Sequence, residues 1–185
     1  IGYKAHLFDR RLRLQATVYQ YDYEGLQLSA YDAPTVSYIL RNAADARTRG
    51  VELSADWVAT RQLRLNASVG YNRAKYLSFP TSSCYQGQTE ADGCVDGVQD
   101  LSGRTLHRAP KWMGNMGIVY DIPLRNGLDL QLSADAKFSD EYQANENHNP
   151  ISVQDSYWLF GAGVRLQGSN WEIAFIGRNL EDEYV

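Results

Sequence analysis

The stretch Leu128–Phe138, which reads LDLQLSADAKF, decides the fold of this chain. Apolar residues occupy every second position of it, and Asp, Gln, Ser, Asp and Lys stand between them. A period of two puts the two sets on opposite faces of a β-strand, whereas a helix would mix them. The same alternation recurs, in places more weakly, through 12–19, 51–58, 63–72, 112–122, 158–166 and 171–175. The sequence therefore predicts an all-β chain.

Length and charge limit the classes of protein that fit. The chain has 185 residues, enough for one domain or for a piece of a larger one. Its 18 basic and 22 acidic residues give a net charge of −4, which excludes a general phosphate-binding surface and a nucleic-acid partner. No window of about 18 uncharged apolar residues could form a membrane helix. The opening Ile1-Gly2-Tyr3-Lys4 is patterned like the interior of a folded element, so we expect a mature, trimmed or fragmentary chain.

The positions of the turns predict how the strands connect. We expect eight strands, at 1–8, 12–29, 36–59, 63–79, 105–123, 128–142, 155–166 and 171–183. Short polar breaks near 9–11, 60–62, 125–127 and 168–170 alternate with long polar stretches near 30–35, 80–104 and 143–154. All tight turns then fall at one end of the sheet and all long loops at the other. Long up-and-down strands connected in this way are typical of an antiparallel transmembrane β-barrel of the outer membrane.

The aromatic residues favour the same interpretation. Apolar residues near the strand ends include rings that suit a membrane–water interface: Trp57, Trp112, Tyr120, Trp158 and Trp171. We expect lipid contact from the apolar set Leu14, Leu53, Leu65, Ile118, Leu132 and Phe175. We expect a wet lumen around the charged set Arg13, Glu52, Arg64, Asp129 and Asp135. Alternation alone also fits a soluble β-sandwich, whose apolar face would pack on a second sheet.

Cys84 and Cys94 stand ten residues apart in a stretch rich in Gly, Ser, Gln and Asp. A single disulfide that closes this loop fits the setting and predicts an oxidising compartment. Two unpaired thiols in a reducing compartment are the alternative. A metal site would need further Cys or His residues close by, and we predict none.

Three segments resemble one known family. The first is Asn42–Trp57 (NAADARTRGVELSADW), the second Leu101–Trp112 (LSGRTLHRAPKW), and the third Gly177–Tyr184 (GRNLEDEY). In this order, with hairpins between them, they are similar to strand motifs of TonB-dependent outer-membrane receptors. The resemblance covers nearly the whole chain.

The resemblance implies a fold, a location and partners. A 22-stranded transporter barrel would need on the order of 500 residues at the strand spacing of this chain. We therefore expect residues 1–185 to be a partial barrel of about eight strands, near its C-terminal third, with the plug domain, its TonB box and the last strand absent. The family implies an importer in the bacterial outer membrane, in contact with its lipid and energised by TonB through the plug. A ferric siderophore or related iron complex is the commonest solute class that it implies, with cobalamin, haem and oligosaccharides as alternatives among which the residues do not select.

Nothing in the sequence predicts catalysis. There is no P-loop and no nucleophile elbow, so we expect a receptor that is not an enzyme and carries no cofactor. His6, His107 and His148 are scattered, which predicts no metal site. Two rival functions stay open: a complete eight-stranded barrel with a structural or adhesion role, and a soluble β-sandwich that binds a ligand.

Two loops are the candidates for solute contact. The longer loop, 80–104, offers Tyr85, Gln86, Gln88 and Arg104 beside the predicted disulfide. A cross-linked loop loses less entropy when it binds a ligand, although the bridge could equally serve only to resist proteolysis. The stretch 143–154 and the residue before it offer Tyr142, Asn145 and His148.

Overall fold

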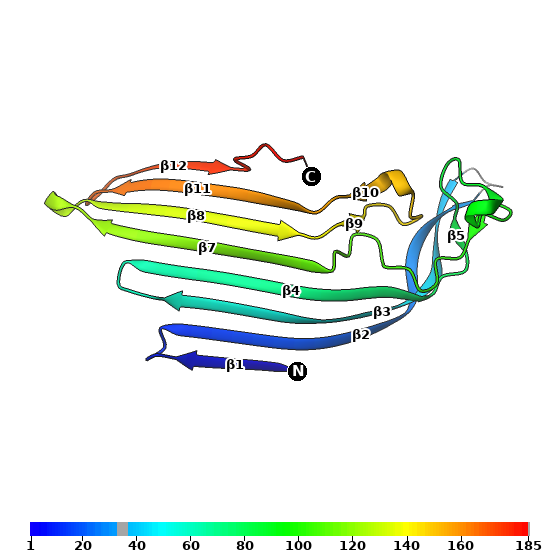
Figure 1. Ribbon diagram of the computed structural model, residues 1–185, viewed down its shortest axis with the longest axis horizontal. Helices are drawn as coiled ribbons and strands as arrows, with labels where there is room; N and C mark the ends of the chain where they lie inside the picture. Colours follow the sequence, from blue (N-terminus) through cyan, green and yellow to red (C-terminus); the bar gives the residue numbers. More distant parts are fainter. Residues whose placement is uncertain (33–36, 185) are drawn as a thin grey trace.

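Eight strands form one antiparallel sheet, as the alternation predicts. The computed structural model describes residues 1–32 and 37–184, with side chains described for all of these except 29–32 and 37–43. The order in the sheet is β1-β2-β3-β4-β7-β8-β11-β12 (Figure 1). The bounds are β1 Gly2–Leu7, β2 Leu12–Asp32, β3 Ser37–Val58, β4 Leu63–Ser78, β7 Trp112–Pro123, β8 Asp129–Ser139, β11 Tyr157–Gln167 and β12 Glu172–Arg178.

The remaining elements are short and lie in the connections. Two ribbons of two strands pair β5 with β6 and β9 with β10. Three 3-10 turns complete the described secondary structure. The bounds are β5 Ser82–Ser83, η1 Glu90–Asp92, β6 Val98–Gln99, η2 Arg125–Gly127, β9 Tyr142–Gln143, η3 Pro150–Ser152 and β10 Val153–Gln154. Within the described ranges, no helix has the length and hydropathy that crossing a membrane requires.

The two ends of the sheet differ as the turns predict. The tight connections after β1, β3, β7 and β11 gather at one end, the turn end, on the left of Figure 1. The connections after β4 and β8 gather at the other, the loop end, and β2 and β3 extend into it. The polar stretch expected near 30–35 becomes strand as far as Asp32. Residues 33–36 and Val185 lie outside the described part of the chain.

The two largest deviations are strand predictions that were too long. The strand expected at 105–123 begins only at Trp112, because Arg108 has a φ of 51° and Pro110 has no backbone N–H to donate. The strand expected at 171–183 ends at Arg178, because Asn179 turns the chain with a φ of 50°. Asn tolerates this left-handed conformation better than most residues do.

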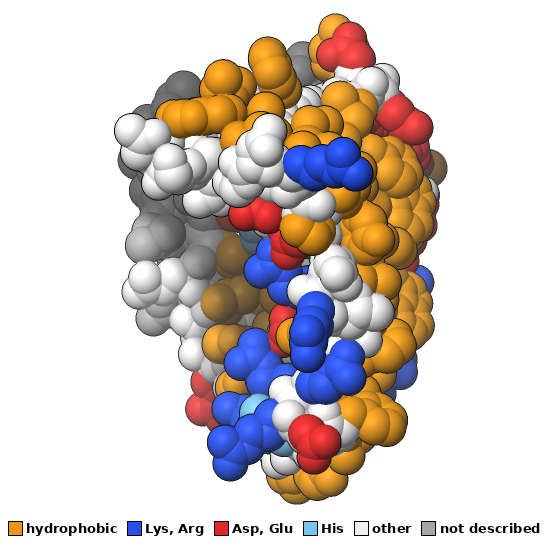
Figure 2. Space-filling view, turned by 90° about the vertical axis from the view of Figure 1, so that its left-hand side faces the viewer, with side chains coloured by type: hydrophobic (Ala, Val, Ile, Leu, Met, Phe, Trp, Pro, Cys, Tyr) orange, Lys and Arg blue, Asp and Glu red, His pale blue; other side chains and the backbone are white. Residues whose placement is uncertain are grey.

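The register separates the side chains into an apolar face and a polar face. Along β4, for example, Leu65 lies opposite Trp57 on one side and Ile118 on the other, and the pattern continues across the sheet. The apolar face carries Leu14, Leu53, Leu65, Ile118, Leu132 and Phe175, and the polar face carries Arg13, Glu52, Arg64, Asp129 and Asp135. Seen from the turn end, hydrophobic side chains cover one side, and charged side chains lie beside the hollow (Figure 2).

Two of the rival architectures are wrong for this chain. In the described residues the sheet stays open, since β1 pairs only with β2 and β12 only with β11, so it is not a closed eight-stranded barrel. The only other sheets in the described ranges are the two short ribbons, which lie in the loops rather than across the apolar face (Figure 1). The soluble sandwich therefore lacks its second sheet.

A small hydrophobic core lies at the loop end. Its members come from the parts of β2, β3 and β4 nearest the loop end and from the connection that follows β4: Leu28, Ala44, Ala46, Tyr76, Phe79 and Leu101. Register shifts bend the hairpin of β2 and β3 beside this core, one of them at Gly25, which has a φ of 63°. The core fixes where the loops sit.

Candidate functional site

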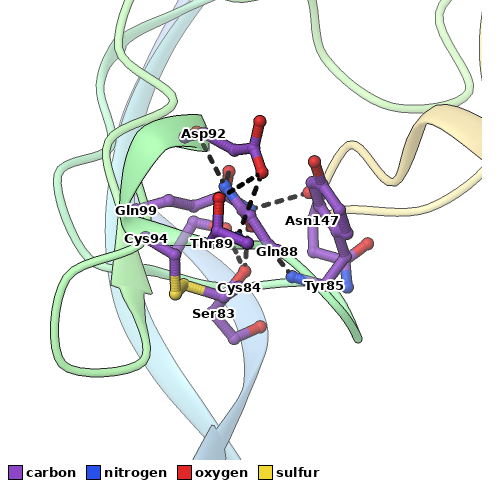
Figure 3. Close-up of a disulfide and its surroundings, with 10 residues drawn as sticks. Ser83, Cys84, Tyr85, Gln88, Thr89, Asp92, Cys94, Gln99 and Asn147 are labelled. Atoms are coloured by element: carbon purple, nitrogen blue, oxygen red, sulfur yellow. Dashed lines mark hydrogen bonds between the residues drawn. A yellow bond between two sulfur atoms is a disulfide. The ribbon is translucent and has the colours of Figure 1, made fainter.

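The connection 79–111, which we call the disulfide loop, folds into a compact unit (Figure 3). Its two cysteines, Cys84 and Cys94, are joined by a disulfide with a Cα–Cα separation of 5.8 Å. Between them η1 is capped by Thr89, whose backbone N and hydroxyl both donate to the Asp92 carboxylate at 3.1 and 2.7 Å. These donations hold the pKa of Asp92 below its usual value.

Two glutamines hold the interior of the disulfide loop. The Gln88 amide accepts from the Tyr85 backbone N at 3.0 Å and donates to the Asp92 carbonyl at 3.1 Å. Its amide nitrogen also donates to the side-chain oxygen of Gln99 at 3.0 Å. Gln99 is almost fully buried, and it donates in turn to the Ser83 carbonyl at 2.9 Å. A buried amide with its hydrogen bonds satisfied fixes a loop in one arrangement.

The second loop, residues 140–156, is fastened to the disulfide loop. Gln99 Nε2 donates to the carbonyl of Asn147 at 2.7 Å, the contact drawn in Figure 3. Arg108 donates from its backbone N to the Gln143 carbonyl at 2.7 Å and from its side chain to the Ala144 carbonyl at 3.3 Å. The two loops therefore form one unit.

A histidine connects this unit to the loop-end core. His107 Nδ1 lies 3.2 Å from the buried Tyr76 hydroxyl, and its Nε2 lies 3.8 Å from the Glu146 carboxylate. Burial lowers the pKa of His107, against the opposing pull of Glu146. The imidazole is therefore neutral near pH 7 and serves as a hydrogen-bonding spacer between strand and loop.

A cavity of about 270 Å³ opens between the two loops. Three of the seven predicted contact residues line it: Arg104, Tyr142 and His148. His148 Nε2 is buried and has no hydrogen-bond partner in the described residues, and burial lowers the pKa of this histidine. The lining also includes Lys111, Asp140 and Glu141. The cavity thus offers a neutral imidazole, a phenol and charges of both signs to a bound molecule.

The other predicted contact residues lie elsewhere. Gln88 supports the loop from inside, as described above. Tyr85 starts a turn beside the disulfide, and Gln86 is exposed in that turn. Asn145 donates to the Ser152 hydroxyl at 2.8 Å and so closes its own loop. Sequence reasoning missed Gln99 and Arg108, because contacts between two loops leave no periodic signal.

The predicted interface aromatics fall into two groups on the apolar face. Trp57, Tyr120 and Trp171 stand near the turn end, and Trp112 and Trp158 stand near the loop end. Each ring keeps between 41% and 47% of its surface exposed. Trp112 contacts Tyr71, and Trp158 contacts Phe138, with ring centroids 4.8 and 5.0 Å apart. From Trp112 to Tyr120 the strand runs roughly 26 Å at about 3.3 Å per residue. At a tilt of about 40° this is a height of roughly 20 Å, which fits within the ~25 Å apolar band of outer-membrane barrels.

In the part of the chain that the structure describes, no three His, Cys, Asp or Glu side chains gather closely enough to hold a metal ion.

Comparison with known families decides what the sheet belongs to. The family described as "TonB dependent receptor-like, beta-barrel" matches residues 1–180 of this chain. The chain belongs to the TonB-dependent receptor β-barrel family. The prediction made from the three motifs is confirmed, and so is the fold class of an antiparallel barrel segment.

Solved structures share the fold of this receptor barrel. The siderophore receptor PiuA from Acinetobacter baumannii superposes with a TM-score of 0.74 at 19% identity, over 98% of this chain and 24% of PiuA. The ferric yersiniabactin uptake receptor FyuA from Yersinia pestis gives 0.71 at 17% identity, over 98% and 24%. The ferric preacinetobactin receptor BauA from Acinetobacter baumannii gives 0.65 at 16%, again over 98% and 24%. The chain thus spans about a quarter of the length of these receptors.

Proposed function

We propose that this chain is part of the barrel wall of a bacterial outer-membrane receptor that imports a scarce solute, a ferric siderophore or a related iron complex. Family membership supports the transport role, and the similar solved structures are siderophore receptors. In this proposal residues 1–185 form a partial barrel domain, and other parts of the polypeptide supply the plug and the remaining strands. TonB delivers energy through that plug, and the protein catalyses no reaction.

The single observation that carries the proposal is the fastened pair of loops with its cavity. The loops stand at the end of the sheet away from the tight turns, where long connections of outer-membrane barrels face outward (Figure 1). Gln99, Arg108 and the disulfide hold them in one arrangement before any solute arrives. A preorganised site loses less entropy on binding. Arg104, Tyr142 and His148 are then the residues of this chain that contact the solute.

The faces of the sheet fit the same proposal. The apolar face meets the lipid of the outer membrane, with the two groups of aromatic rings at its two interfaces. The polar face lines the lumen, where the exposed pair of Arg13 and Asp56, 2.7 Å apart, meets water. A disulfide in the loops supports this orientation, because the outside of the outer membrane is an oxidising compartment.

Uptake of ferric siderophores by cells that produce the intact receptor tests this proposal. Deleting 84–94 removes the cross-linked part of the disulfide loop and should weaken solute binding and uptake. Two substitutions that each remove one arginine charge form a matched pair. Arg104→Gln changes the cavity, and Arg125→Gln, in the turn after β7, is the control. Only Arg104→Gln should raise the solute concentration needed for half-maximal uptake.

Two results would contradict the proposal in different ways. Unchanged binding after the deletion would move recognition to the plug or to other loops of the receptor. Uptake that survives in cells without the inner-membrane energy-coupling complex would exclude a TonB-dependent importer and leave a passive pore or an adhesin. Heat-modifiable migration on gels shows in each case that the barrel has assembled.

A further inference from the structure

The cavity between the two loops carries charges of both signs in balance. Two cations, Arg104 and Lys111, and two acids, Asp140 and Glu141, belong to its lining. Burial lowers the pKa of His148, so that imidazole adds no charge near pH 7. The four charges sum to zero, and neither sign dominates the cavity.

These four charges do not neutralise one another by contact. Within the described residues, none of the four forms an ion pair. The segments that carry them are anchored separately to the wall. The Arg104 carbonyl accepts from the Tyr76 backbone N at 3.0 Å, and the Asp140 backbone N donates to the Trp112 carbonyl at 2.8 Å. The charged groups are therefore available to a molecule that enters the cavity.

A cavity of this kind favours a molecule that itself carries both signs. A lone anion is attracted by two of the charges and repelled by the other two, and a lone cation meets the reverse. A molecule with both charges can place each one beside the opposite sign. Ala109, Val153 and the ring of Tyr142 also line the cavity. They offer apolar contact to the carbon chain that separates the two charges.

The size of the cavity limits how much of a solute can enter. Its volume of about 270 Å³ is below the roughly 300–1,000 Å³ of pockets that enclose a drug-sized ligand. A whole ferric siderophore is at least as large as such a ligand. The cavity therefore takes one end of the solute and leaves the iron outside.

We propose that the cavity binds a zwitterionic group at one end of the imported solute, an ammonium and a carboxylate joined by a short chain as in an amino acid. Arg104 and Lys111 contact its carboxylate, which a guanidinium can bind through two parallel hydrogen bonds. Asp140 and Glu141 contact its ammonium. This inference names a substrate class for the site described above, and it rests on the proposed function.

Three small molecules of equal size test the inference on the detergent-purified intact receptor. Glycylglycine carries both charges, glycylglycinamide keeps only the ammonium, and glycolylglycine keeps only the carboxylate. At low ionic strength glycylglycine should bind about fivefold more tightly than either analogue, a modest factor because exposed charge pairs are weak. Added salt should shrink this preference by screening the charges. Ligand-observed nuclear magnetic resonance measures such weak binding.

Two variants of the cavity should have opposite effects on the analogues. The variant Arg104→Gln, Lys111→Gln should bind glycylglycine about fivefold more weakly and glycylglycinamide more tightly than the wild type does. The variant Asp140→Asn, Glu141→Gln should weaken glycylglycine by a similar factor and strengthen glycolylglycine instead. A merely structural role of these residues would change the binding of all three probes in the same direction.

A control variant separates position from charge. Arg125→Gln with Asp129→Asn removes one charge of each sign near the turn after β7 and should keep the wild-type preference. Heat-modifiable migration on gels shows that each variant has assembled. The comparison of the three probes on the wild type needs no variant at all.

The outcomes that would overturn the inference are distinct from those that test import. Equal affinity of the wild type for the three probes would refute the zwitterion site. Equal losses in the control and in the cavity variants, or a cavity variant that weakens all three probes alike, would refute it too. Uptake that survives without the energy-coupling complex would instead contradict the proposed function, because binding to the purified receptor requires no transport.

Discussion

Two segments of β4 carry opposite patterns on one continuous backbone. From Leu63 to Tyr71 the apolar side chains lie on the outward face, and Asn66 and Ser68 lie on the inward face. From Asn72 to Tyr76 the outward positions are the basic Arg73 and Lys75, and the inward ones include Ala74 and Tyr76, both buried. The two segments share the same strand, the same neighbours and the same pleat.

The difference shows that the surroundings, and not the sheet, set which face is apolar. Lipid outside and water inside favour apolar residues on the outward face. In the proposed membrane placement, water lies outside the strand once it leaves the lipid, and the loops fill the inside with Phe79 and Leu101. The loop end is then packed like a small soluble protein on top of the barrel wall. In the same placement, the change between Tyr71 and Arg73 marks the edge of the membrane.

Removing the buried ring of Tyr76 should have the largest effect of all these changes, on the stability of the β4 segment 72–78 and the loops packed on it. Tyr76 keeps only 1% of its surface exposed and packs on Phe79, with ring centroids 4.9 Å apart. Tyr76→Ala should cost the loop unit about 3–5 kcal/mol. Hydrogen exchange over 79–111 and 140–156 should rise strongly. The same substitution on the outward face, Tyr71→Ala, should leave this protection intact, and equal effects of the two would break the comparison.

A charge introduced on the outward face tests whether the part of the sheet level with residues 63–71 meets lipid. Ala67→Arg places a cation where lipid is proposed, opposite Met116 and midway between the interface rings Trp112 and Tyr120, and should cost roughly 2–4 kcal/mol near mid-membrane. Ser68→Arg, one residue away on the polar face, should cost less than about 1 kcal/mol. Equilibrium unfolding of the lipid-embedded receptor measures both. Similar losses at the two positions would mean that the outward face does not meet lipid.

The disulfide should matter for the loops alone. Replacing both cysteines, Cys84→Ser with Cys94→Ser, should destabilise the loop by about 2–3 kcal/mol in the chain-entropy picture. Proteolysis within 79–111 should quicken, while unfolding of the membrane segment stays as it was. Reductant added to the wild type should reproduce the effect. If both thiols of the oxidised wild type react with an alkylating agent, the bond is absent from the mature protein.

Acid should loosen the contact between the loops, by the smallest of these effects. Burial holds the pKa of His107 and His148 below 6.5, so the open form takes up protons first as the pH falls. Stability of the contact is therefore full above that pH and declines as pH drops from 6.5 toward the lowered pKa values. Hydrogen exchange of 140–156, corrected for its intrinsic rate, should be faster at about pH 5 than at about pH 7.5. His148→Gln should flatten this dependence, whereas His6→Gln should not.

The sheet could be predicted from the sequence because its signals are local. Alternation along Leu128–Phe138 identifies both faces, and each short polar break identifies a turn. The extra length predicted before Trp112 has a local reason too, since alternation does not register the positive φ of Arg108.

The loop unit could be predicted only in outline. The cysteine spacing indicated a bridge, but the contact from Gln99 to Asn147 joins residues 48 apart in two irregular segments. Such a pair has no period and no motif. Gln88 was expected to face a ligand, and in the structure its amide bonds the Tyr85 backbone N, the Asp92 carbonyl and the Gln99 side chain within the loop.

The order of the strands also bears on how the chain reaches its final state. Each strand of the large sheet pairs with the one before it in the series, so the wall can grow by adding one hairpin after another. The junction of β4 with β7 must wait for a long excursion across residues 79–111, and that of β8 with β11 for a shorter one across residues 140–156. The entropy cost of closing a loop rises slowly with its length, so this loop delays the pairing of β4 with β7 only modestly. An early bond between Cys84 and Cys94 would shorten the loop that has to close. The slowest step in building the wall should then be the joining of its two halves at Tyr71 and Trp112.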